Sequence, residues 1–278
     1  MKYLFFGTPE FAFSILSGLI KADLSPMGVV CNPDRPVGRK KVITPPPVKT
    51  LALENGIKIF QPEKLSGFDA NGADFAIVAA YSKIIPQNVL DMFPKGVIGI
   101  HPSLLPKYRG ATPIQSAILA GEKETGVTLY MMDGKVDHGE IINNGKIKIS
   151  EDDSYSSLEN KSAELAVALV LEFIKNFNAG KIITMKQDES RATLTKKFVT
   201  QDGFVDPEVL SEAQNGASLD KAIAISRKIK ALNPEPGVFT LSPSRGGPRR
   251  MKILEVELSD GKLKLKRVQY DGEKPKSI

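Results

Sequence analysis

The chain has 278 residues, of which 41% are hydrophobic and 25% are charged. This composition is typical of a folded globular protein and excludes a disordered or fibrous chain. A single cysteine, Cys31, excludes an internal disulfide and a thiolate metal cage. The apolar run at 3–6 is too short for a signal peptide or a membrane span, so we expect a cytoplasmic protein that does not associate with membranes.

The formal net charge of +6 is concentrated near the C-terminus. Residues 207–278 hold 14 Lys and Arg against 9 Asp and Glu, whereas residues 1–206 hold 24 against 23. A basic segment of this kind can bind a polyanion such as a nucleic acid. Lysines scattered over a solvated face are the commoner explanation, and the charge count alone leaves both readings open.

Strand-like apolar runs alternate with helical patterns through the first two-thirds of the chain. We expect strands at 2–6, 27–31, 57–60, 73–79 and 97–101, and helices from Glu10, from Val48, over 86–92 and over 113–120. Strands that are apolar on both faces and separated by helices predict a parallel sheet covered on both sides, an α/β fold. Runs at 126–132 and 141–149 predict later strands of this sheet, followed by a long helix that ends near Gly180.

The last third of the chain has a different pattern. Residues 182–206 are polar and without a clear period, which predicts a linker. A helix over 218–231 and strands at 238–241, 251–258 and 262–268 follow. In the last strand leucines alternate with lysines, which predicts one buried and one basic face. We therefore expect a domain at 1–181, a linker at 182–206 and a small β-rich domain at 207–278.

The turn after the first strand, Gly7-Thr8-Pro9, lies where a Rossmann fold carries its phosphate-binding loop. It lacks the Gly-x-Gly-x-x-Gly pattern, which disfavours dinucleotide binding.

His101 is one of only two histidines, and it ends the strand at 97–101 where a loop rich in Pro and Gly begins. The ends of such strands are where α/β folds place their chemistry. Asp137 lies in a glycine-flanked turn, from which its carboxylate could orient His101 and favour the charged ring. Spacing alone does not separate this acid/base pair from a structural, hydrogen-bonded histidine.

A longer motif changes this balance. The sequence His101-x-Ser-Leu-Leu-Pro-x-Tyr-Arg-Gly, followed by Asp137-x-Gly, resembles the signature of the folate-dependent formyltransferases. Segments across nearly the whole chain resemble the branch of that family that acts on initiator tRNA, and they lie at 7–11, 33–39, 47–49, 60–62, 80–81, 233–237 and 268–275. The resemblance implies a Rossmann-like parallel-sheet formyltransferase domain with a small C-terminal β-barrel, OB-like, that binds tRNA.

The activity implied by the resemblance is transfer of a formyl group from 10-formyltetrahydrofolate to the amino group of methionine on initiator tRNA, for translation initiation. His101 would shuttle the proton, and Asp137 would hold the imidazole and its charge. The resemblance implies a monomer that uses no metal.

Two sets of binding residues are carried over from the resemblance. The folate pocket would be lined by Ser103, Leu104, Leu105 and Pro106, with Ile84 and Ile85 as its apolar wall. The acceptor end of tRNA would meet the basic loop that holds Arg35, Arg39, Lys40 and Lys41. Without the resemblance, the basic residues of this loop indicate no more than an ordinary solvated loop.

Gly99 departs from the pattern of the family, which is Asn-x-His where this chain has Gly99-Ile100-His101. Positions 99 and 101 share one face of a strand, and the family asparagine would donate to the formyl oxygen. Losing one such donor costs about 10²–10³ in rate. We therefore expect slow turnover, relieved by Gly99→Asn, unless a water or another side chain replaces the amide.

Two alternatives stay open beside this reading. A sugar-nucleotide N-formyltransferase shares the His/Asp core, although the basic loop and basic C-terminal segment favour tRNA. A tRNA- or folate-binding homologue with lost activity would explain Gly99.

Overall fold

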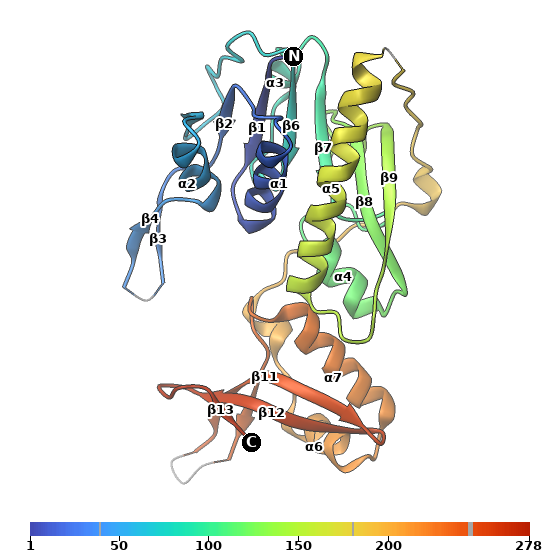
Figure 1. Ribbon diagram of the computed structural model, residues 1–278. Helices are drawn as coiled ribbons and strands as arrows, with labels where there is room; N and C mark the ends of the chain where they lie inside the picture. The colour runs from blue at the N-terminus through green and yellow to red at the C-terminus, as the bar shows by residue number, and fades with distance from the viewer. Residues whose placement is uncertain (39, 180, 244–246) are drawn as a thin grey trace. The chain divides into compact units, whose positions relative to one another are not determined.

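The computed structural model describes residues 1–38, 40–179, 181–243 and 247–278 (Figure 1). Residue contacts divide the chain into two compact units. The first unit consists of Met1–Gly110, Glu124–Lys148 and Glu159–Leu194, and the second of Ala111–Lys123, Ile149–Leu158 and Thr195–Ile278. None of the helices in the described part of the chain is both long and apolar enough to cross a membrane.

A seven-stranded sheet in the order β5-β2-β1-β6-β7-β8-β9 forms the centre of the first unit. Its strands are β1 (Tyr3–Gly7), β2 (Gly28–Val30), β5 (Lys58–Phe60), β6 (Phe75–Ala79), β7 (Val97–His101), β8 (Glu124–Met131) and β9 (Ile141–Lys148). The strands from β5 to β7 are parallel, and Figure 1 shows β1, β6 and β7 side by side. The α/β prediction is confirmed.

The sequence predicts that the last two strands, β8 and β9, continue the parallel sheet. This prediction is wrong in direction, since both strands are antiparallel to their neighbours. A parallel return to the sheet needs a crossover over its face. The one helix between β7 and β8 is α4 (Pro113–Ala120), which belongs to the second unit and packs there on α7 (Leu219–Leu232). No crossover helix of the first unit lies between β7 and β8, so β8 returns antiparallel.

Both faces of the sheet are covered. In β1, Tyr3 and Phe5 point to one face and Leu4 and Phe6 to the other, as strand geometry requires. The first face packs against buried residues of α1 (Glu10–Lys21), α2 (Pro47–Glu54) and α5 (Tyr155–Asn178). The second face packs against loop residues and α3 (Gln87–Leu90). Strand β7 pairs on both edges up to Ile100, and His101 itself pairs with Thr128 of β8, which holds the backbone at His101 in place.

A small hairpin was not predicted from the sequence. It consists of β3 (Arg35–Val37) and β4 (Val42–Thr44), an antiparallel pair whose residues are all exposed. Its strands are too short for a periodic pattern to show.

The second unit contains α4, α6 (Pro207–Asn215) and α7, together with a four-stranded antiparallel sheet. The strands are β10 (Phe239–Ser242), β11 (Arg249–Ser259), β12 (Lys262–Tyr270) and β13 (Lys276–Ser277), in that order. The predicted small β domain is confirmed. Helix α6 was not predicted, although Asp206 caps it by accepting from the Glu208 backbone N–H at 2.8 Å.

The polar segment that follows α5 is ordered by specific contacts. Met185 and Ile141 exchange backbone hydrogen bonds, both of 2.8 Å, and residues up to Leu194 belong to the first unit. Two short 3₁₀ helices, η1 (Glu189–Arg191) and η2 (Thr200–Gly203), lie in this segment.

Candidate active site

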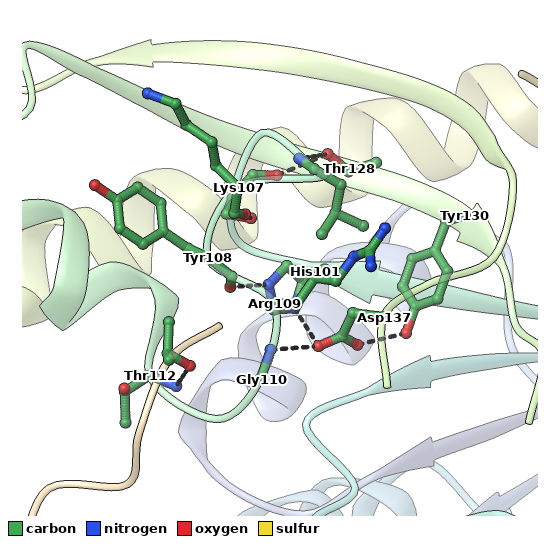
Figure 2. A network of polar contacts seen from close by, with 12 residues as sticks. His101, Lys107, Tyr108, Arg109, Gly110, Thr112, Thr128, Tyr130 and Asp137 are labelled. Carbon is green, nitrogen blue, oxygen red and sulfur yellow. Dashed lines mark hydrogen bonds and ion pairs between the residues drawn. The ribbon is translucent and has the colours of Figure 1, made fainter. Parts of the chain in front are cut away.

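The site begins at the C-terminal end of β7, where His101 is buried and both of its ring nitrogens face oxygen atoms (Figure 2). Nε2 lies 2.8 Å from the backbone oxygen of Tyr108, and Nδ1 lies 3.5 Å from Oδ2 of Asp137. An imidazole can donate at both nitrogens only in its protonated form. Both ring nitrogens of His101 therefore face hydrogen-bond acceptors.

The loop that follows β7 is fixed by hydrogen bonds to β8. Thr128 Oγ1 donates to the Ser103 backbone oxygen at 2.7 Å and accepts from the Leu105 N–H at 3.1 Å. Ser103 Oγ donates to the Lys107 carbonyl oxygen at 2.6 Å. These bonds position the carbonyl of Tyr108 against His101.

The turn that carries Asp137 brings its carboxylate to the same place. Oδ2 accepts from the Gly110 backbone N–H at 2.7 Å, and Oδ1 accepts from the Tyr130 hydroxyl at 2.7 Å (Figure 2). Two donors from different segments thus fix the carboxylate beside His101. The structure brings together His101 and Asp137, the two residues that the sequence pairs.

Gly99 lies at this site as well, directly opposite Tyr130 in the pairing of β7 and β8. A Cβ built on Gly99 would lie 2.7 Å from the Tyr130 hydroxyl oxygen and closer still to two ring carbons. The space that a side chain at position 99 would fill is therefore occupied by the tyrosine. Burial, and then the Asp137 carboxylate, raise the pKa of the Tyr130 phenol, which keeps it a hydrogen-bond donor.

Sequence reasoning missed Tyr130 and also Gln187. Gln187 Nε2 donates to the backbone oxygens of Asp137 and Gly139, at 2.9 and 2.8 Å. Its Oε1 accepts from Arg109, whose guanidinium also forms two hydrogen bonds with the Glu189 carboxylate. Gln187 thus joins the Asp137 turn to the loop after His101. It lies in the segment predicted as a linker, where no periodic signal singles it out.

The residues predicted to contact folate differ in exposure. Ser103 and Leu105 are buried, and Leu105 packs in an apolar cluster with Tyr130 and Ile141. Leu104 and Pro106 are half-buried, and Ile84 is 86% exposed, whereas Ile85 is buried in the core of the second sheet face. Among these residues, Leu104, Pro106 and Ile84 therefore have apolar side-chain surface that is not covered by the rest of the protein.

The predicted tRNA contacts lie in or beside the β3–β4 hairpin. Arg35, Lys40 and Lys41 are exposed, and Arg39 lies outside the described residues. Val37, Val42 and Ile43 are exposed on the same hairpin. The hairpin therefore presents both cations and apolar side chains.

Within the described ranges, no group of three or more His, Cys, Asp and Glu side chains is placed to hold a metal ion.

Three kinds of comparison place these features among known proteins. The family model described as Formyl transferase matches residues 1–174. A methionyl-tRNA formyltransferase of Kosmotoga olearia is 40% identical over 266 residues, which are 94% of this chain and 81% of that protein. One of Dictyoglomus thermophilum is 40% identical over 263 residues, 92% of this chain and 78% of that protein.

Among solved structures, an N-formyltransferase of Helicobacter canadensis in complex with folinic acid and dTDP-3-aminofucose has a TM-score of 0.65. The two chains are 20% identical, and the match covers 94% of this chain and 88% of the other. This likeness shows a shared fold.

Proposed function

The chain belongs to the formyl transferase family, and we propose that it transfers the formyl group of 10-formyltetrahydrofolate to the amino group of methionine on initiator tRNA. The observation that carries the proposal is the placement of His101 and Asp137, with a ring nitrogen 3.5 Å from a fixed carboxylate oxygen at the end of β7. Relatives that are 40% identical across most of the chain and are named methionyl-tRNA formyltransferases support the choice of acceptor.

The reaction requires one proton to move between two nitrogens. The methionine nitrogen attacks the formyl carbon, a new C–N bond forms, and the bond from that carbon to N10 of the folate breaks. The attacking amine loses a proton and N10 gains one, so a single group that accepts and then donates can serve both ends. We assign this role to His101. During the reaction the substrate nitrogen takes the place of the Tyr108 backbone oxygen as the partner of His101 Nε2.

Asp137 contributes by holding the charged ring. Its carboxylate carries a negative charge beside Nδ1, which stabilises the imidazolium formed in mid-reaction. The backbone N–H of Gly110 and the hydroxyl of Tyr130 keep the carboxylate from turning away.

The folate co-substrate supplies the formyl group, and the residues present fit it. Leu104, Pro106 and Ile84 offer apolar surface to its ring. Ser103 and Leu105 support the loop from beneath, because both are buried and hydrogen bonded to neighbouring backbone or to Thr128.

The tRNA is bound, in this proposal, by the β3–β4 hairpin and the basic C-terminal domain. Arg35, Lys40 and Lys41 are exposed cations that can neutralise phosphates, and we extend this role to Arg39. In chain order, this proposal assigns catalysis to residues 1–181 and tRNA binding to residues 207–278. The segment at 182–206 links the two and also supplies Gln187 to the candidate active site. We propose that the protein acts as a monomer. We place it in the cytoplasm, because initiator tRNA is charged and used there.

An assay of two acceptors tests the function. The protein is mixed with 10-formyltetrahydrofolate and either charged initiator tRNA or a dTDP-linked amino sugar, and formylated product is measured. We expect kcat/KM for the charged tRNA to exceed that for the sugar nucleotide by at least 10³-fold. A preference for the sugar nucleotide would overturn the tRNA assignment in favour of a sugar N-formyltransferase.

A further inference from the structure

Tyr130 lies at the centre of the candidate active site, although no sequence motif includes it. It is buried on β8, pairs with Gly99 on β7 and packs with Leu105 and Ile141. Its hydroxyl lies 2.7 Å from Oδ1 of Asp137 (Figure 2). A buried phenol of this kind needs a partner, and here the partner is the carboxylate next to His101.

Tyr130 fills the space that a side chain at residue 99 would need. Its hydroxyl oxygen lies 2.7 Å from where a Cβ of residue 99 would be, and two of its ring carbons lie closer still. Tyr130 can occupy this space only because residue 99 has no side chain. Glycine at 99 and tyrosine at 130 therefore form a matched pair.

The hydroxyl has one proton to donate, and Asp137 receives it. Asp137 has two oxygens to fix. Gly110 N–H holds Oδ2, the oxygen that faces His101, and Tyr130 holds Oδ1. Without the second bond the carboxyl group can rotate about its own axis, and the distance between Oδ2 and His101 Nδ1 is no longer set.

We propose that Tyr130 is a positioning residue for formyl transfer, which acts by holding the Asp137 carboxylate against His101 from the space left open by Gly99. The proposal rests on the proposed function, because His101 and Asp137 are its proton-transfer pair. The space beside Gly99 is thus filled by the Tyr130 side chain, so that either a side chain at residue 99 or the tyrosine can occupy it, but not both.

The first test is Tyr130→Phe, which keeps the ring and removes only the hydroxyl. We expect kcat for formylation of charged tRNA to fall about 10-fold to 10²-fold, since misplacing a catalytic group by about 1 Å has that effect. KM for both substrates should stay within twofold. The matched control is Tyr3→Phe, which removes a buried hydroxyl donated to the Leu24 carbonyl oxygen in the same unit, and should leave kcat unchanged. An unchanged kcat in Tyr130→Phe would overturn the proposal.

A double-mutant cycle separates positioning from direct contact with substrate. If Tyr130 acts through Asp137, Tyr130→Phe has no further effect on kcat in the Asp137→Asn background. Losses that multiply would show that the hydroxyl acts on the substrate itself, and they would overturn the positioning role.

A third variant tests whether residues 99 and 130 compete for the same space. Tyr130→Leu opens the space beside residue 99, and adding Gly99→Asn fills it with an amide. We expect the double variant to have at least tenfold higher kcat than Tyr130→Leu alone, with both proteins folded by circular dichroism. Equal or lower activity in the double variant would contradict this competition.

Failure of the inference and failure of the proposed function give different results. If the unmodified protein does not formylate charged tRNA, the proposed function is wrong and Tyr130 has no reaction to serve. If the unmodified protein is active and Tyr130→Phe equals it, only the inference is wrong.

Discussion

Gly99 and Tyr130 face each other across β7 and β8, and the tyrosine ring fills the volume that any larger residue at 99 would need. The Tyr130 side chain can therefore take this position only because residue 99 is glycine. The glycine that the sequence analysis marks as a departure from the family pattern thus packs against a second residue, which lies in a different strand.

Gly99→Asn alone is expected to damage the protein, which is the reverse of the rise in rate that the sequence by itself suggests. The new Cβ would lie 2.7 Å or less from atoms of Tyr130, whose side chain is buried against Leu105 and Ile141 and hydrogen bonded to Asp137. Overpacking of this kind costs about 1–3 kcal/mol. Urea unfolding measures the loss, and an unchanged midpoint together with a higher kcat would refute this account of Gly99.

His101→Ala is expected to abolish formyl transfer, because it removes the ring nitrogen beside Asp137 that carries the proton. Folate binding, measured by fluorescence titration, should change by no more than a few-fold, since the Ser103–Pro106 part of the loop is held by Thr128. Retention of more than a tenth of the activity would remove His101 from proton transfer.

Asp137→Asn should lower kcat strongly, since the amide carries no charge to stabilise the imidazolium. Combined with His101→Ala, it should cause little further loss, because the two residues act as one unit. Single-turnover rates of the two single variants and the double variant test this coupling. Losses that multiply would mean that Asp137 serves the reaction independently of His101.

Binding of charged tRNA should weaken steeply with salt, and the slope should be reduced by Lys40→Gln/Lys41→Gln. Each cation that neutralises a phosphate releases counterions, so its removal lowers the slope by about 1. Lys21→Gln/Lys148→Gln changes the net charge equally at exposed sites outside the hairpin and is the matched control. An equal loss of slope in the control would show that the hairpin has no special part in tRNA binding.

The base of the hairpin should lose stability in acid. Hydrogen bonds from Gln61 and then Lys49 lower the pKa of Asp34 below its ordinary 3.8. The folded state then binds fewer protons than the unfolded state, so the stabilisation is complete above pH 3.8 and disappears as the pH falls through the lower folded value. In urea unfolding, the difference between the unmodified protein and Asp34→Asn should therefore vanish at low pH. A difference that persists there would exclude this ion pair as its source.

The sequence predicts the parallel half of the sheet because strands such as β1 and β6 are apolar on both faces, and it places His101 at a strand end because the apolar run stops there. It does not predict that β8 runs antiparallel, since direction depends on whether the intervening helix crosses the sheet. Tyr130 within an apolar strand has the pattern of an ordinary core residue. Its role depends on cross-strand register, which one sequence does not display.

The most direct test of the central claim is single-turnover formylation of charged initiator tRNA with 10-formyltetrahydrofolate at saturation and the protein in excess over tRNA. We predict complete formylation of the methionine by the unmodified protein, and none by His101→Ala within the same time. Binding of both substrates by the unmodified protein without formyl transfer would contradict the account and identify a binding protein in place of an enzyme.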